Sequence, residues 1–243
     1  MEVLILEENV FDDTAADIAF AQLKKKPHST IGFATGNTTV GFHKSLVKKI
    51  LDEKIDKTKF STFNLDEYVG VSSKDPASCY FRMEEQFFKP LQLGKDQINF
   101  LNDISEQEDL QLRCTQFDQR IEECGGIDLQ FLGIGLNGHI GFNEPGTAFE
   151  TNTHVVDIAL HTRESKISVF GSLDKVPKQG VTMGIKSIMM AKKIVLLAKG
   201  ESKADIIVKA LAGPVTKDVP ASVLQLHPNL VVVLDQAAAQ ILP

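Results

Sequence analysis

Short, nearly continuous apolar runs alternate along the chain with segments whose apolar residues recur at helical spacing. The apolar runs, which predict strands, lie at 3–6, 30–34, 59–65, 127–135, 193–198 and 230–234. The helical patterns lie at 9–25, 38–52, 75–88, 105–124 and 201–211. The first of them places Val10, Ala15, Ile18, Ala19 and Leu23 on one face. Apolar strands separated by helices predict a parallel sheet that helices cover on both faces.

The fold class predicted by this pattern is α/β, a single Rossmann-like domain over residues 1–243. No internal repeat, low-complexity tract or Pro/Gly/Ser-rich linker divides the chain. The stretch 141–185 is less regular and contains four glycines, so we expect a lid-like excursion over the sheet edge there.

The charge balance and the cysteine content disfavour several classes of protein. The chain has 26 Lys+Arg against 32 Asp+Glu, which disfavours a nucleic-acid or anionic-membrane surface. Its apolar runs are all far shorter than the ~20 residues that span a bilayer, and the N-terminus lacks the basic start of a secretory signal. Its cysteines, Cys79, Cys114 and Cys124, are scattered, which favours neither a zinc site nor a disulfide scaffold and predicts a cytoplasmic protein.

In a parallel α/β sheet, ligands bind where the strands end, so the residues after each apolar run are the candidate site. The loop after 30–34 reads Ala34-Thr35-Gly36-Asn37-Thr38 and precedes a helix. Backbone N–H groups and hydroxyls at a helix N-terminus suit a phosphate. The alternative is an ordinary helix cap by Thr38. The chain lacks a GxxxxGK[ST] pattern here, so a nucleotide P-loop is not supported.

Two adjacent carboxylates, Asp66 and Glu67, follow the run 59–65. Burial at a strand end raises the pKa of a carboxyl group and makes its anion a better general base. The alternative is a solvated turn, which would be the better interpretation of an isolated Asp-Glu pair.

The glycine-rich segment 132–146 concentrates polar side chains in the positions Asn137, His139, Asn143 and Glu144. A histidine with a nearby carboxylate can shuttle protons, since the carboxylate fixes the ring's orientation and tautomer. Gly133, Gly135 and Gly138 form a GxGxxG pattern, but dinucleotide binding is disfavoured because a helix-breaking sequence follows.

Single lysines and histidines carry weaker signals. Lys203 follows the run 193–198 at a predicted helix start and is either a phosphate ligand or a solvated lysine. Four histidines without an evident partner are predicted to be surface or structural residues: His28, His43, His154 and His161.

The motifs NLDEY, LGIGLNGHIGFNEPG, the Thr-Gly-Asn-Thr loop and PASVLQLHP together resemble the glucosamine-6-phosphate deaminase family over about residues 2–235. The resemblance implies conversion of glucosamine 6-phosphate and water to fructose 6-phosphate and ammonia, without a metal or organic cofactor. It also implies roles for individual residues. Asp66 would deprotonate the second sugar carbon, and His139, held by Asn137 and Glu144, would open the ring. Thr35, Gly36, Asn37, Thr38 and Lys203 would bind the phosphate.

The sequence departs from this family at two places. Its loop reads Asn37-Thr38-Thr39 where Gly-Ser/Gly-Thr-Pro is usual, which loses the preset backbone angle of proline. Ser168 stands where typical members have a second arginine that clamps the phosphate, and Lys166 is the nearest candidate replacement.

Because of these two departures, the sequence predicts more than one candidate substrate. Glucosamine 6-phosphate is the preferred substrate, galactosamine 6-phosphate is the runner-up, and a 6-phosphogluconolactonase-like hydrolase or a non-catalytic sugar-phosphate sensor is a further alternative. The expected partner is a small amino-sugar phosphate, with no nucleic acid and no membrane. We expect a monomer or a small homo-oligomer.

Overall fold

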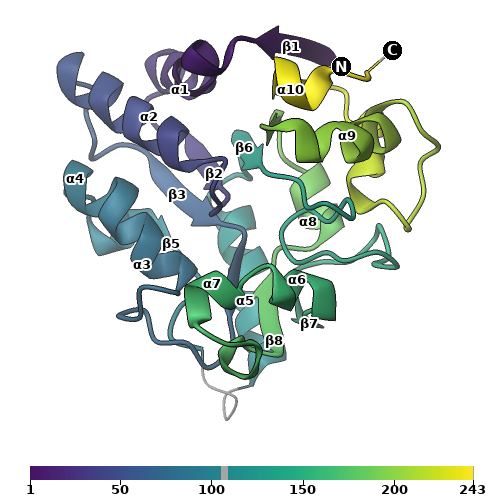
Figure 1. Ribbon diagram of the computed structural model, residues 1–243. Coiled ribbons are helices and arrows are strands. Elements are labelled where there is room, and N and C mark those ends of the chain that lie inside the picture. The colour runs from purple at the N-terminus through teal and green to yellow at the C-terminus, as the bar shows by residue number, and fades with distance from the viewer. Residues whose placement is uncertain (105–108, 243) are drawn as a thin grey trace.

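The computed structural model describes residues 1–104 and 109–242. The strands of its central sheet are β1 (Glu2–Leu6), β2 (Thr30–Phe33), β3 (Ser61–Asn64), β5 (Ile98–Asn99), β6 (Leu129–Leu132), β9 (Ile194–Ala198) and β10 (Leu230–Asp235). Within the described residues these seven strands pair in parallel in the order β1–β10–β9–β6–β2–β3–β5 (Figure 1). The predicted parallel α/β fold is therefore confirmed.

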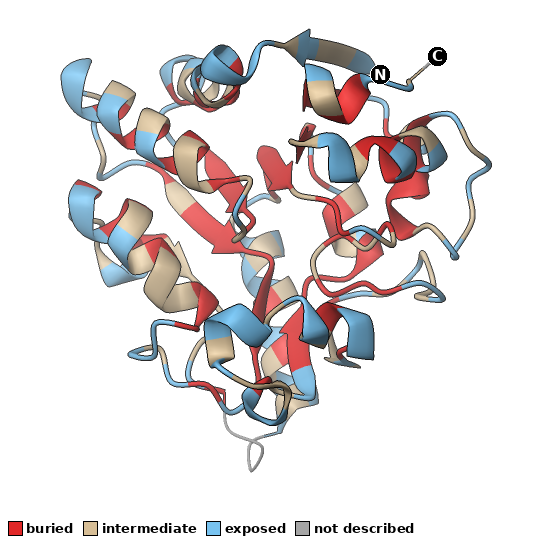
Figure 2. Cartoon of the chain, viewed as in Figure 1, coloured by how far each residue is buried: buried red, intermediate tan, exposed pale blue. Residues whose placement is uncertain are grey.

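Successive side chains of the central strands point to opposite faces of this sheet, and both faces are buried. In β9, Ile194 and Leu196 point into one hydrophobic cluster, whereas Val195 and Leu197 point into another on the opposite face. One face packs against α1 (Glu8–Lys25), α2 (Val40–Asp52), α3 (Cys79–Met83), a π-helical turn (Glu84–Phe88) and α4 (Lys89–Leu91). The other packs against α5 (Leu110–Glu123), α8 (Ile185–Met189), α9 (Ala204–Leu211) and α10 (Gln236–Ala239). Figure 2 shows the inner strands of this sheet in red, whereas the edge strand β1 is exposed or half-buried.

A second, antiparallel sheet was not predicted from the sequence. Its strands are β4 (Asp66–Tyr68), β7 (His154–Asp157) and β8 (Gln179–Thr182), in the order β4–β8–β7. The short helices α6 (Leu160–Glu164) and α7 (Ile167–Phe170) connect β7 to β8. Much of the stretch expected to be an irregular lid over 141–185 is thus a regular sheet with helical connections.

The two sheets meet at Leu65, the one residue between β3 and β4. Its N–H donates to the carbonyl of Phe33 in β2, and its own carbonyl accepts from Met183, just after β8. The single strand predicted over 59–65 is therefore a strand of the central sheet that continues, after a bend, into the small sheet. This bend places Asp66 at the junction.

Other boundaries differ in detail from the predictions. The helix expected from Asp75 begins at Cys79, because the Ser78 side chain accepts a hydrogen bond from the N–H of Phe81 and caps it. In the first helix Phe11 is fully buried, whereas Val10 is exposed.

The predicted start of the helix over 105–124, at Ser105, Gln107 and Glu108, lies outside the described residues; α5 is capped by Asp109. None of the helices in the described part of the chain has the length and apolarity needed to cross a membrane.

Candidate active site

The order of the strands defines where a ligand should bind. From β2 the chain moves outward to β3 and β5 and then returns as β6 on the other side of β2. Loops that leave neighbouring parallel strands in opposite directions open a crevice at the carboxyl ends of those strands. The predicted site residues of 35–38, 66 and 137–144 follow β2, β3 and β6 and therefore share this edge.

Asp66 is a buried carboxyl group with few partners. It is 9% exposed, and no described residue donates a hydrogen bond to its carboxylate. Burial, and after it the charge of Glu67, raises the pKa of Asp66 from 3.8 to about 7, while the Lys166 charge opposes the shift. A carboxylate with this pKa, not engaged by the protein, is suited to accept a proton near neutrality.

Glu67 differs from its neighbour because its carboxylate is fully occupied. It accepts hydrogen bonds from the Ser78 hydroxyl at 2.7 Å and from the backbone N–H groups of Tyr68, Cys79 and Tyr80 at 2.8, 3.1 and 2.9 Å. Burial raises its pKa, although each of these donors lowers it. Glu67 therefore anchors the start of α3, and the solvated turn considered for this pair is wrong for both residues.

Glu144 is the centre of a second polar cluster. It accepts hydrogen bonds from the Thr162 hydroxyl at 2.6 Å and from the Asn137 amide at 2.7 Å, and its Oε2 lies 3.5 Å from Nδ1 of His139. Burial of Glu144 raises its pKa, but the contact with His139 and the two hydrogen bonds outweigh burial and hold the pKa at about 2. A permanent carboxylate thus faces the imidazole of His139.

Asn137 and Gly135 fix the position of His139. The Asn137 Oδ1 accepts a hydrogen bond from the backbone N–H of His139 at 3.2 Å. A side chain at Gly135 would overlap the imidazole, because a Cβ built there falls within the ring's own space. Glycine at 135 is therefore what leaves room for His139.

Gly141, two residues after His139, lies against Asp66. This glycine has a φ of +59°, and a Cβ on it would lie 2.6 Å from Oγ1 of Thr182 and 3.6 Å from Oδ2 of Asp66. Thr182 is also the register partner of Asp66 in the small sheet. The carboxylate of Asp66 thus lies against the backbone two residues beyond His139.

The predicted phosphate loop closes on itself ahead of α2. Thr39 rather than Thr38 occupies the N-cap position, but its hydroxyl donates to the carbonyls of Ala34 and Gly36 and accepts no hydrogen bond from the helix. Among the described residues, Thr35 Oγ1 has no hydrogen-bond partner although it is buried. A buried hydroxyl with no partner at a helix N-terminus is available to a ligand.

Lys203 reaches this edge from the segment after β9. Its Nζ donates to the carbonyl of Ile134 at 2.6 Å. Burial, and after it the charge of Lys166, lowers the pKa of Lys203. Lys203 is therefore a half-buried cation beside the β6 loop rather than a solvated lysine.

Two residues of the cluster were not among the predicted site residues. His161, predicted to be surface or structural, lies with Nε2 2.6 Å from the Asn137 amide nitrogen and 3.9 Å from Glu144. Thr162 carries the 2.6 Å bond to Glu144. Both come from α6, which the sequence pattern did not predict.

A metal ion is geometrically possible at this cluster. One ligand atom each from His139, Glu144 and His161 lie within 4.8 Å of one another. The Asn137 amide nitrogen lies 2.7 Å from Glu144 Oε2 and 2.6 Å from His161 Nε2, whereas the buried Nδ1 of His139 makes no hydrogen bond within the described residues.

A shallow hollow of about 610 Å³ lies elsewhere, on the outer side of the small sheet. It is lined by residues 69–70, 157 and 174–179, and the predicted site residues are absent from that lining. The candidate site is thus the sheet edge and not this hollow.

Comparison with known proteins identifies the family of this chain. A model of the family described as glucosamine-6-phosphate isomerases/6-phosphogluconolactonase matches residues 6–232. A curated glucosamine-6-phosphate deaminase from Thermoanaerobacter pseudethanolicus is 44% identical over 229 residues, covering 94% of this chain and 90% of that protein.

Solved structures agree as well. A monomeric glucosamine-6-phosphate deaminase superposes with a TM-score of 0.95 at 39% identity, covering 99% of this chain and 100% of that one. The 6-phosphogluconolactonase from Thermotoga maritima superposes with a TM-score of 0.76 at 17% identity, covering 96% and 99% of the two chains. The second likeness shows a shared fold.

Proposed function

Because the chain belongs to the glucosamine-6-phosphate isomerase/6-phosphogluconolactonase family, we infer that it is a glucosamine-6-phosphate deaminase. The enzyme converts glucosamine 6-phosphate and water to fructose 6-phosphate and ammonia in amino-sugar catabolism. Two observations carry the assignment of residues: Asp66, a carboxylate with a pKa of about 7, lies against Gly141, and His139, two residues earlier in the chain, lies 3.5 Å from Glu144.

Ring opening is the first step that this geometry supports. We propose that His139 moves the proton of the anomeric hydroxyl to the ring oxygen, which breaks the C1–O5 bond and gives the open-chain aldehyde. The carboxylate of Glu144 stabilises the transiently charged imidazole, and Asn137 orients it. The low pKa of Glu144 keeps this carboxylate charged at all physiological pH values.

Proton transfer between carbons is the second step. Asp66 removes the proton from C2, the electron pair of the C2–H bond forms the C1–C2 double bond, and the π pair of the C1 aldehyde moves to O1. O1 takes a proton from solvent, which gives an enolamine. The C2 proton then returns from Asp66 to C1 as the nitrogen lone pair forms the C2–N double bond. The product is an imine at C2, which water hydrolyses to the ketone and ammonia. Positioned acid–base catalysis of this kind typically contributes about 10²–10⁴-fold.

The remote phosphate supplies orientation. We propose that Thr35, Gly36, Asn37 and Thr38, at the N-terminus of α2, bind it together with Lys203. Binding energy at a non-reacting group can hold C2 against the base and so be used for catalysis.

An ammonia-release assay tests this function. Purified protein is supplied with glucosamine 6-phosphate, galactosamine 6-phosphate or 6-phosphogluconolactone, and ammonia or acid is measured. We expect ammonia from glucosamine 6-phosphate with the highest kcat/KM. Galactosamine 6-phosphate belongs in the comparison because Ser168 is exposed on α7 and offers no guanidinium to the phosphate. Lactone hydrolysis without ammonia release would reverse the assignment.

We further propose that the enzyme works as a monomer in the cytoplasm. The structurally similar deaminase is described as monomeric, and the cysteines of this chain are free thiols, as expected in a reducing compartment. Light scattering is expected to give a mass near 26.7 kDa, and a stable dimer would contradict the proposal.

A further inference from the structure

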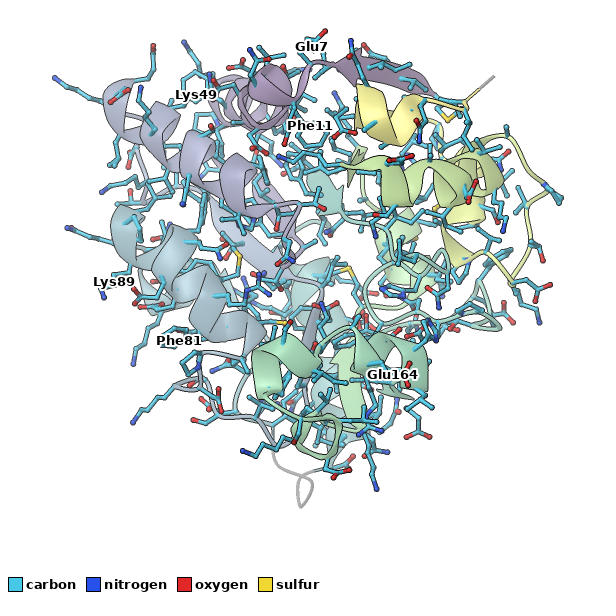
Figure 3. All side chains as sticks on the ribbon, viewed as in Figure 1. Glu7, Phe11, Lys49, Phe81, Lys89 and Glu164 are labelled. Atoms are coloured by element: carbon cyan, nitrogen blue, oxygen red, sulfur yellow. The ribbon has the colours of Figure 1, made fainter. Side chains whose placement is uncertain are left out.

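Arg82, on α3, approaches the phosphate loop from the side that faces β3. Its Nη2 donates to Oδ1 of Asn37 at 3.4 Å, a long contact for a guanidinium hydrogen bond. Figure 3 labels Phe81, which precedes Arg82 and marks this turn of α3. The loop therefore has an arginine beside it that sequence analysis did not single out.

The guanidinium of Arg82 makes few hydrogen bonds or ion pairs with the described residues of the protein. Arg82 is half-buried, and no carboxylate of the described residues lies within ion-pairing distance of it. A guanidinium has five N–H donors arranged to bind two oxygens of a phosphate or carboxylate at once. One long bond to an amide leaves most of that capacity free.

His43 adds no second positive charge beside Arg82. His43, on α2 behind the loop, is fully buried. Burial, and after it the charge of Arg82, lowers the pKa of His43 to about 4, so His43 is neutral at physiological pH.

Lys203 lies on the other side of the same loop. It follows β9 and binds the carbonyl of Ile134 after β6, whereas Arg82 contacts Asn37 after β2. Lys203 therefore lies beside the loop after β6, the strand next to β2, and Arg82 contacts the loop after β2 itself. A dianion bound at 35–38 would lie between them.

We propose that Arg82 clamps the phosphate of the sugar from the side opposite Lys203 and is a further phosphate-binding residue of this enzyme. The guanidinium exchanges its bond to Asn37 for a two-point contact with phosphate oxygens. The proposal rests on the function inferred above. It also accounts for how this chain binds a phosphate without an arginine at position 168.

Kinetics of Arg82→Gln and Arg82→Lys test the proposal, with Arg120→Gln as the matched control because Arg120 is an exposed arginine paired with Glu123. For Arg82→Gln we expect KM for glucosamine 6-phosphate to rise about 10–100-fold, as for loss of a hydrogen-bonded charge. The Ki of inorganic phosphate as a competitive inhibitor should rise by the same factor, whereas kcat should change less. Arg82→Lys should recover part of both losses, since lysine keeps the charge but not the fork.

A residue that only braces the loop would change thermal stability without changing the phosphate Ki. Values of KM and Ki within about twofold of wild type in Arg82→Gln would therefore overturn the proposal, since such a small change corresponds to loss of no charged contact. If Arg82→Gln does not fold, Arg82→Lys decides: a weaker phosphate Ki supports the clamp and an unchanged one overturns it.

The proposed function and the clamp can fail separately. If the wild type releases no ammonia, the function is wrong. The rise in Tm caused by inorganic phosphate, compared between wild type and Arg82→Gln, then still tests Arg82: a smaller rise in the variant supports the clamp, and an equal rise overturns it.

Discussion

Asp66→Asn is expected to lower kcat for ammonia release from glucosamine 6-phosphate by about 10³-fold or more, because asparagine keeps the shape of the base but cannot accept the C2 proton. The KM should change little, since phosphate binding does not involve this position. Steady-state kinetics of wild type and variant give both numbers. A variant with more than a tenth of the wild-type kcat would remove Asp66 from its proposed role.

The pH profile gives an independent check on the same residue. A base must be ionised, and the pKa of Asp66 is raised to about 7, so kcat/KM should fall below pH 7 by about tenfold per pH unit. The residual rate of Asp66→Asn should lack this limb. Glu144, with a pKa of about 2, contributes no limb in this range.

As the pH rises, the stability of the fold should decrease while the activity increases. The fold favours the protonated form of Asp66, so the free energy of unfolding decreases as pH rises from about 4, where the unfolded carboxyl ionises, to about 7. The shift corresponds to at most about 4 kcal/mol. Asp66→Asn should therefore have a higher Tm than wild type at pH 8 and a smaller advantage at pH 4.

Glu67→Gln is the matched control for that stability gain. The glutamine amide cannot accept every bond that the Glu67 carboxylate receives from Ser78 and three backbone N–H groups. We expect this neighbour to lose stability at pH 8, where Asp66→Asn gains it. Equal losses of stability in the two variants would mean that burial does not destabilise the charged form of Asp66.

His139→Gln is expected to lower kcat/KM for glucosamine 6-phosphate by about 10²–10³-fold, because glutamine cannot carry the proton from the anomeric oxygen to the ring oxygen. The defect should be confined to ring opening. A 5-deoxy analogue of the substrate cannot close the pyranose ring, so wild type and variant should process it at more similar rates. An equal deficit with both substrates would contradict the assigned step.

Gly135→Ala provides a second test of the same step that keeps the imidazole. The new Cβ overlaps the ring of His139 and must displace it. We expect a smaller loss than for His139→Gln, again relieved by the 5-deoxy analogue. A wild-type rate would show that the observed ring position is not needed for ring opening.

Six of the seven strands of the central sheet could be predicted from the sequence, because its inner strands bury both faces. The two-residue edge strand β5 was not predicted. Residues such as Val195 and Leu196 are apolar on either side of the backbone, and helices with clear periodicity separate the runs. The small sheet could not be predicted in this way. Its strand β7 is half-exposed, and β4 pairs with residues more than a hundred positions later in the chain. Local patterning carries no information on either feature.

The same distinction separates the site residues that were found from those that were missed. Asp66, His139 and Lys203 directly follow or lie near strand ends, so the fold class alone predicts that they share an edge. His161 and Arg82 come from helices outside the central sheet, and only the tertiary structure brings them to Asn137 and Asn37. Their roles, like those of the motif residues, stay predictions until the variants are measured.

The single-residue connection at Leu65 restricts which mutations this protein can tolerate. Leu65 is tied to Phe33 on one side and to Met183 on the other, so the spacing between the sheets is fixed at a single residue. Successive side chains in a strand point to opposite faces, and one inserted or deleted residue reverses them all. Insertion or deletion of one residue here would therefore turn the carboxyl group at position 66 away from Gly141. It would also disturb the hydrogen bonds by which Glu67 holds the start of α3. This joint should tolerate changes of residue type better than any insertion or deletion.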